Sequence, residues 1–308
     1  DFVGVEGEVY LTQTGEVTVR CEKITLLSKT LRPLPEKFHG LNDTETIYRQ
    51  RYLDLITNEK SRQVFLTRSK IESFIRRYLE DNGFIEVETP VLQTSVSGAS
   101  AKPFFTHHNA LDIECNLRIA TETWLKQCIS AGFDRVFEMG KDFRNEGMDP
   151  SHLQEFTQVE WYASYWNFED NIKFFYELVN KMLKECLGTT KVTYQGQEIE
   201  FASQWPRINY VERMNEILGF DCLAEEDVDA FKKKVVERGL YTYGDLEECK
   251  TVRTLIDYIY KRKIRADIVN PTIIYNYPAV LVPLARRNDK DSRVADMFQV
   301  LAGGAELV

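Results

Sequence analysis

The sequence predicts an α+β fold in which a mainly antiparallel sheet is flanked by helices. Apolar and polar residues alternate around residues 112–119, 135–143 and 156–165, which is the spacing of strands. Apolar residues recur at helical spacing in Val64–Asn82 and Phe168–Leu187. The chain has 308 residues, 43% of them hydrophobic, which is enough for about two domains.

Composition narrows the class of protein. The 39 Lys and Arg residues against 48 Asp and Glu residues give a net charge of −9, which argues against general coating of nucleic acid but leaves room for a local basic patch. The six cysteines are scattered without a CxxC pair, so we expect neither a zinc site nor a disulfide scaffold. No apolar run approaches the ~18 residues of a membrane span. We therefore expect a soluble, cytoplasmic protein and, since the first residue is Asp1, a piece of a longer chain.

The first 60 residues read as two segments. Residues 2–29 alternate as strands around a turn at Thr14-Gly15, and two or three strands cannot bury a core alone. They are either the edge of a larger sheet or the end of a truncated barrel. Two prolines and a glycine in residues 31–40 predict a linker, and the pattern becomes helical from Thr44.

The next elements lead towards a predicted ligand-binding region. The helix at 64–82 ends at Asn82-Gly83, and a short strand over 84–88 stops at Thr89-Pro90. Small residues crowd positions 95–101, which favours a mobile loop near a ligand. A helix over 123–130 separates the first two alternating runs.

The C-terminal half is predicted to mix helices and strands. The helix at 168–187 has Asn167 as its N-cap. Residues 207–265 return to helical spacing with clusters of charge and read as a helical insertion, and residues 272–284 regain strand character.

Polar residues interrupt the strands at positions that a sheet core would not choose. Arg144 and Glu146 are two apart in a strand pattern, so they share one face. Either they pair with each other, or Arg144 is a planar fork for phosphate or carboxylate, and the pattern alone leaves the two readings about even.

The following strand adds further candidates. Phe156, Glu160 and Tyr162 are spaced to line one face. His152 lies in the preceding polar loop, where a lone histidine is more often solvated than functional. Glu122 ends a strand and starts a helix, where a capping carboxylate would be ordinary.

Several of these stretches resemble the class II aminoacyl-tRNA synthetases. Residues 82–90, NGFIEVETP, resemble motif 1 of that class, and FRNE at 143–146 followed by HLQEF at 152–156 resembles motif 2. Within the class, the chain is most similar to the lysyl-tRNA synthetases of subclass IIb. The stretches that carry this closer resemblance are LRPLPEKFHGL at 31–41, YRQRYLDL at 48–55, AKPFFTHHNALD at 101–112 and PLARRND at 283–289.

The resemblance implies activation of L-lysine by ATP, with Mg²⁺, and transfer of the lysyl group to tRNA(Lys). Arg144 would be the catalytic residue that holds the lysine carboxylate and the ATP α-phosphate together. It implies ATP binding by Arg144, Glu146, His152 and Phe156, and lysine binding by Gly98, Glu122, Glu160 and Tyr162. It also implies a homodimer formed through motif 1.

The resemblance divides the chain into three parts and also shows departures. Residues 1–30 would be the last part of an OB-type anticodon-binding barrel, 31–60 the linker and start of the catalytic domain, and 61–308 a catalytic domain without motif 3. The family's two metal-binding glutamates correspond to Gln299 and Glu306, and an amide oxygen attracts magnesium less than a carboxylate. We expect the chain ending at Val308 to be inactive by itself.

Two other readings remain open. The aspartyl- and asparaginyl-tRNA synthetases share the barrel and motifs 1 and 2. A synthetase-like paralogue that binds tRNA or a partner without catalysis belongs to a different class, and Gln299 at a metal position keeps that reading alive.

Overall fold

The computed structural model describes residues 1–35, 40–149 and 152–308. It divides into two compact units, Asp1–Ser69 and Lys70–Val308, with the division inside one long helix. Each unit is described by itself.

The first unit begins with a two-stranded antiparallel ribbon. Strand β1 (Phe2–Leu11) pairs with β2 (Val17–Ser28), and Gly15 in the turn has a φ of 83°. The predicted strands and their turn are confirmed. Both faces of the ribbon are largely exposed, including Val17 at 75%, so these strands have no core of their own.

Three helices follow the predicted linker. The described residues of the linker form neither helix nor strand, and residues 36–39 lie outside the described part of the chain. The helices are α1 (Thr44–Arg49), α2 (Arg51–Thr57) and α3 (Glu59–Asp81), the last of which continues into the second unit. The predicted helix at 64–82 is confirmed, and it begins five residues earlier than expected.

The second unit contains a sheet of β3, β7 and β8. Strands β7 (Arg135–Phe143) and β8 (Glu155–Ala163) pair antiparallel along their whole length. Strand β3 (Ile85–Glu86) pairs parallel with β7, so this part of the sheet differs from the antiparallel prediction. The difference arises because β3 and β7 are joined by a long crossover, which allows parallel pairing.

A smaller sheet and a helix occupy this crossover. Strands β4 (Leu92–Gln93), β6 (Ile113–Leu117) and β5 (Phe105–His108) form the sheet, in that order. The predicted strand near 112–119 therefore pairs with β4 and β5 and not with β7. The predicted helix is α4 (Glu122–Ser130).

Helix α5 (Phe168–Leu187) follows the sequence prediction at both ends. The side chain of Asn167 accepts hydrogen bonds from the backbone N–H groups of Glu169 and Asp170, and the Asp170 carboxylate accepts one from the backbone N–H of Asn167. Gly188 then ends the helix in the left-handed conformation. The apolar face of α5 packs in one cluster with Trp161 of β8.

The remaining strands and helices belong to the C-terminal half. Strands β9 (Lys191–Tyr194) and β10 (Gln197–Glu200) form a hairpin. The last sheet has the order β11 (Arg207–Asn209), β12 (Thr272–Pro278), β13 (Val294–Ala302) and β14 (Ala305–Glu306). Only β11 pairs parallel within it.

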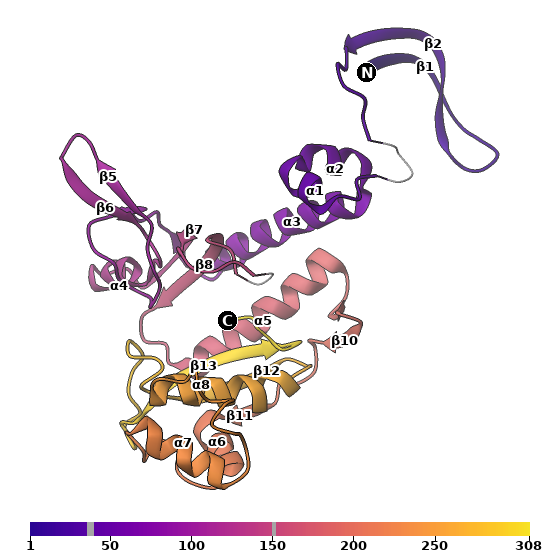
Figure 1. Cartoon of the computed structure of the whole chain (residues 1–308). Coiled ribbons are helices and arrows are strands. Elements are labelled where there is room, and N and C mark those ends of the chain that lie inside the picture. The colour runs from indigo at the N-terminus through magenta and orange to yellow at the C-terminus, as the bar shows by residue number, and fades with distance from the viewer. Residues whose placement is uncertain (36–39, 150–151) are drawn as a thin grey trace. The chain divides into compact units, whose positions relative to one another are not determined.

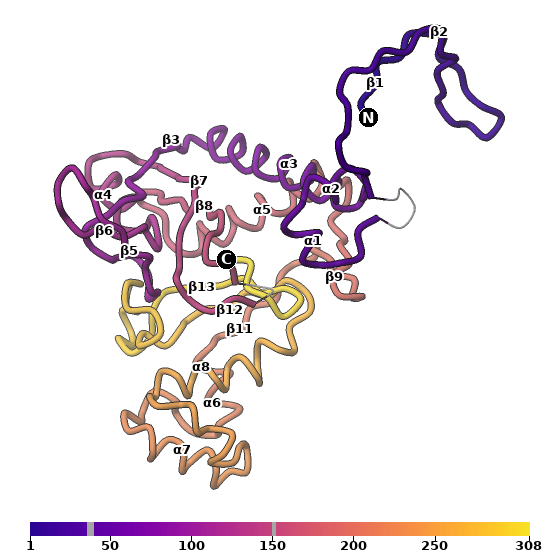
Figure 2. Tube along the Cα trace, turned by 45° about the horizontal axis from the view of Figure 1, so that its top comes forward, coloured from indigo at the N-terminus to yellow at the C-terminus, as the bar shows by residue number. Residues whose placement is uncertain are grey.

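The segment predicted to be a helical insertion contains helices α6 (Tyr210–Leu218), α7 (Val228–Glu237) and α8 (Val252–Lys263), and a 3₁₀ turn, η1 (Arg265–Asp267). Both views show these three helices gathered together (Figures 1 and 2). They share a hydrophobic cluster with Ile274 and Leu301 on one face of the last sheet, while Ile273 and Val300 on the other face join the cluster of α5. Alternation along β12 and β13 therefore buries both faces of this sheet.

Candidate active site

One face of the β7–β8 ribbon carries a row of polar and aromatic side chains. Because β7 and β8 pair in register, Glu138 lies opposite Glu160 and Asp142 lies opposite Phe156, so all four share a face. The other face contributes Trp161 to the hydrophobic cluster with α5. The polar face therefore lies away from this hydrophobic cluster.

A buried arginine, Arg118, lies beneath this row. Its side chain is 2% exposed and forms ion pairs with Glu138 and, at 3.1 Å from Nε to Oδ1, with Asp142. Its guanidinium also donates hydrogen bonds to the carbonyl of Lys141 and to Thr89. This arginine and the two carboxylates are a charged cluster that the sequence analysis missed.

Close packing around Arg118 explains a glycine in the middle of β7. A Cβ atom at Gly140 would collide with Nη2 of Arg118, so any other side chain there would have to displace this guanidinium. Asp142 is fully buried. Its carboxylate forms an ion pair with the Arg118 guanidinium, but its oxygens accept no hydrogen bond from the described residues. Burial raises the pKa of Asp142 to about 6, an effect that Arg118 partly offsets.

Glu160 is held in place by three donors. The hydroxyl of Thr121 and the amide of Gln158 donate to its Oε2, at 2.9 and 2.8 Å, and the Tyr162 hydroxyl donates to its Oε1 at 2.7 Å. Burial, and then the charge of Glu160, raises the pKa of Tyr162 well above its ordinary value. The predicted pair of Glu160 and Tyr162 therefore forms a preorganised acidic group.

Two other predicted lysine-binding residues lie together. A Cβ atom at Gly98, which has a φ of 86°, would be 3.3 Å from Cβ of Glu122. Glu122 is the first residue of α4 and pairs with Lys126 at 2.5 Å. Since Glu122 also acts electrostatically on Tyr162, these residues share one region with Glu160.

The side chains of Arg144 and Glu146 do not pair with each other among the described contacts. Strand β7 ends at Phe143, so both residues lie in the loop that follows, and the expectation that they share a strand face is wrong. The guanidinium of Arg144 lies 5.0 Å from the ring centroid of Phe156 and donates to the carbonyl of Ile119. Glu146 instead accepts a hydrogen bond from the backbone of Lys102. The Arg144 guanidinium is thus held over the ring of Phe156, beside the polar face.

His152 remains exposed at the end of the same loop. Its Nδ1 lies 2.7 Å from the carboxylate of Asp149, and 73% of its side chain is exposed. Pro150 and Ser151, which join these two residues, lie outside the described part of the chain.

Gln299 and Glu306 lie on the last sheet and contact each other. The Gln299 amide donates to Oε2 of Glu306 at 3.4 Å. The other carboxylate oxygen pairs with Arg265 at 2.7 Å, and Tyr277 donates to the Gln299 carbonyl at 2.6 Å. Among the described residues there is no group of three or more His, Cys, Asp or Glu side chains arranged to hold a metal ion.

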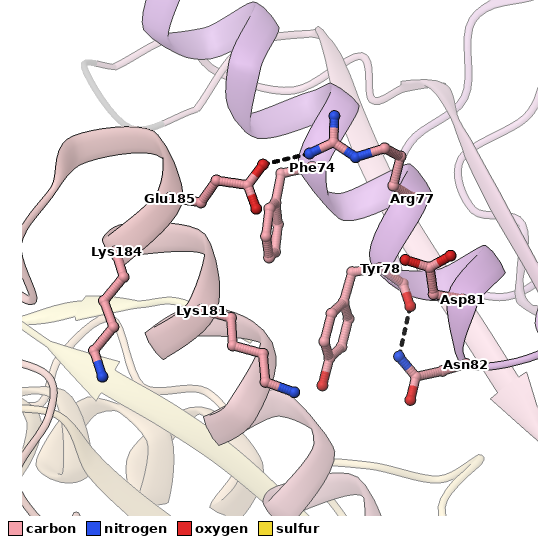
Figure 3. Close-up of a pocket in the computed structure, with 8 residues that line it drawn as sticks. All are labelled: Phe74, Arg77, Tyr78, Asp81, Asn82, Lys181, Lys184 and Glu185. Carbon is pink, nitrogen blue, oxygen red and sulfur yellow. Dashed lines mark hydrogen bonds and ion pairs between the residues drawn. The ribbon is translucent and has the colours of Figure 1, made fainter.

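Two grooves of the second unit differ in whether predicted site residues line them. One groove is lined by Glu160 and Tyr162 of β8 and by Met297 and Phe298 of β13. Another lies between the last turns of α3 and α5 (Figure 3), where Arg77 pairs with Glu185 and Lys181 lies over the ring of Tyr78. No predicted site residue lines this second groove, and three of its charged side chains are already engaged.

Comparison with known proteins identifies the family. The model of the class II tRNA synthetases (D, K and N) matches residues 43–308. The chain belongs to this family. The predicted α+β class II synthetase fold is thereby confirmed, and the β1–β2 ribbon is compatible with the end of an OB-type barrel.

Two curated relatives show the extent of the similarity. The chain is 43% identical over 300 residues to the lysine–tRNA ligase of Bacillus cytotoxicus, and these residues cover 97% of the chain and 59% of the relative. It is also 43% identical over 306 residues to the lysine–tRNA ligase of Lactococcus lactis, with coverage of 99% and 61%. The chain therefore spans about three-fifths of the length of these relatives. In the described part of this class II synthetase, no helix is long and apolar enough to cross a membrane.

The sequence held one signal for the missed cluster. Arg118 interrupts an apolar run, and Glu138 and Asp142 stand four residues apart in a strand pattern. Charges in such positions are costly unless paired. Pairing across 20 residues of sequence depends on the tertiary fold, so the partners could not be assigned beforehand.

Proposed function

We propose that the protein containing this chain is a lysine–tRNA ligase, which activates L-lysine with ATP and transfers the lysyl group to tRNA(Lys). The observation that carries the proposal is the gathering of Glu122, Glu160 and Tyr162 in one region of the catalytic unit. Lysine is an amino acid with two ammonium groups. Glu160 offers one of them a carboxylate without a basic partner among the described residues, and Glu122 offers the other a carboxylate whose partner within the chain is Lys126. The relatives named lysine–tRNA ligase support the same substrate.

In this proposal Arg144 brings two anions together. The lysine carboxylate must approach the α-phosphate of ATP, and a guanidinium between them reduces their repulsion and orients both groups. Contact with Phe156 and with the carbonyl of Ile119 limits the movement of Arg144. The uncovered part of the Phe156 ring offers a face for adenine.

Glu146 and His152 complete the proposed ATP site. Glu146 lies in the loop after β7, where its backbone N–H donates to the carbonyl of Arg144. Exposed His152 can approach the triphosphate from the same loop. Magnesium arrives with ATP as part of the substrate, where it neutralises phosphate charge.

Selectivity for lysine follows from the acidic pocket. The three hydrogen bonds to Glu160 fix its carboxylate but leave its negative charge without a basic partner among the described residues. Gly98 allows the backbone to approach Glu122 closely, near the proposed position of the lysine α-amine. A neutral amino acid would leave a partly desolvated charge unpaired, which disfavours its binding.

We also propose a homodimer formed through motif 1 and the helix α3 that leads into it, and a cytoplasmic location. In the first unit, Val64, Phe65 and Leu66 of α3 are 46–66% exposed, and Phe65 and Leu66 line a hollow with Leu55 and Ile56 of α2. An exposed apolar surface of this kind is typical of a partner interface. The six cysteines are all free, which suits a reducing compartment.

The test is ATP–pyrophosphate exchange by the full-length protein with each amino acid separately. We expect exchange with lysine and none above background with aspartate or asparagine. Exchange driven by either of these would overturn the proposed substrate. A folded full-length protein that catalyses no exchange with any amino acid would instead support the paralogue that binds without catalysis.

A further inference from the structure

The guanidinium of Arg265 lies beside Glu306, at the turn between β13 and β14. Nη1 of Arg265 lies 2.7 Å from Oε1 of Glu306, and Nε of Arg265 donates to the carbonyl of Gly304 at 2.9 Å. The backbone N–H of Gly304 in turn donates to the carbonyl of Ile268, just after the turn that carries Arg265. One guanidinium therefore contacts both the carboxylate and the backbone of the β13–β14 turn.

Gln299 is held in the same network from the other side. Tyr260 and Tyr277 are buried, and their hydroxyls lie 3.1 Å apart. Because the Tyr277 hydroxyl donates to the Gln299 carbonyl oxygen, Tyr260 donates to Tyr277. The Gln299 side-chain carbonyl thus already accepts a hydrogen bond from Tyr277, and the Gln299 amide nitrogen donates to Glu306.

We propose that Arg265 supplies the positive charge beside Glu306 that a divalent cation would otherwise supply, so that Gln299 and Glu306 hold no magnesium ion of their own. The donor set does not fit such an ion. Magnesium requires several oxygen ligands at about 2.0–2.1 Å in octahedral geometry, whereas one oxygen of Glu306 already faces a guanidinium and the other faces an N–H donor. A divalent cation bound there would be repelled by the adjacent guanidinium.

Gln299 is consistent with this assignment. One carboxylate paired with one arginine is electrically balanced, whereas a second carboxylate at position 299 would add a negative charge that needs another cation. The amide instead both accepts from Tyr277 and donates to Glu306. We therefore expect Arg265 and Gln299 together to exclude a metal ion, so that creating a metal site here requires changing both residues.

The experiment measures binding of Mn²⁺ alone, as a paramagnetic substitute for Mg²⁺, to the full-length protein by electron paramagnetic resonance. No nucleotide or lysine is present. Wild type and Glu306→Gln should bind the same number of Mn²⁺ ions with the same affinity. The double variant Arg265→Met/Gln299→Glu should gain one site, about 10-fold or more tighter than any site in the wild type, because it gains ligand charge and loses the competing cation.

Two controls make the result specific. Arg207→Met removes a positive charge from the pair of Arg207 and Glu169 and should create no comparable site. Adding Glu306→Gln to the double variant should abolish the new site. A wild-type Mn²⁺ site that disappears in Glu306→Gln would overturn the proposal, as would a folded double variant that gains no site.

The wild-type comparison still decides the question if the double variant fails to fold. The inference rests on the proposed function only for the expectation that a cation belongs at this position. Because the measurement needs neither lysine nor ATP, a failed exchange assay and a failed metal prediction are separate outcomes.

Discussion

The β7–β8 and β12–β13 strand pairs both carry polar side chains, but they bury their charges to different degrees. Beside β7–β8, Arg118 and its carboxylate partners on β7 are almost inaccessible, at 1–5% side-chain exposure. Beside β12–β13, Arg265 and Glu306 are 27% and 40% exposed, and the buried groups are neutral tyrosines. Removing one member of a buried charged group should be far more costly than removing a neutral hydrogen bond.

The largest effect is expected for Arg118→Met. The change leaves Glu138 and Asp142 buried without their cation, and breaking such a group costs about 3–5 kcal/mol of unfolding free energy. Urea denaturation of the full-length protein measures this loss. The matched change Arg207→Met breaks an exposed pair with Glu169 and should cost no more than about 1 kcal/mol. Equal losses in the two variants would contradict the distinction between the strand pairs.

Arg144→Lys tests the loop that follows β7 through activity. Lysine keeps the charge but loses the planar fork and its fixed position over Phe156. We expect lysine-dependent pyrophosphate exchange to fall roughly 10²-fold, the scale for loss of a preorganised donor. The unfolding free energy should change little because the side chain is only partly buried. Normal exchange by this variant would refute the proposed role of Arg144.

The buried carboxylate of Asp142 should make stability depend on pH. Its folded-state pKa is raised from 3.8 to about 6, so the folded protein binds more protons than the unfolded chain between these values. Stability should therefore fall by about 3 kcal/mol as pH rises through this window and change little from this source above it. Asp142→Asn should remove that slope in urea titrations performed at several pH values. A variant with the wild-type slope would assign the effect to another group.

The smallest effect is expected in the tyrosine network of β12–β13. Tyr277→Phe removes the hydrogen bonds to Gln299 and Tyr260 and should cost about 1 kcal/mol. Tyr210→Phe is the matched control, because the buried Tyr210 hydroxyl has no hydrogen-bond partner among the described residues. Its removal should be neutral or slightly stabilising in thermal unfolding. A greater loss for Tyr210→Phe than for Tyr277→Phe would reverse this ranking.

The sequence by itself determined features that depend on local spacing. The β1–β2 turn, helix α5 with its Asn167 cap, and strand β7 agree with the sequence prediction, since turn chemistry, capping and alternation act over a few residues. The motifs also predicted the family, which the match over residues 43–308 shows. Alternation placed Glu160 and Tyr162 on one face.

Only the tertiary structure decided which distant groups meet. It paired β3 with β7 in parallel and placed Arg118 between Glu138 and Asp142. It also brought Arg265 to Glu306, 41 residues along the chain. A charged side chain in a sequence shows only that a partner is required. Which partner is available depends on chain crossings and close packing, and these are set by the burial of the whole core rather than by any local pattern.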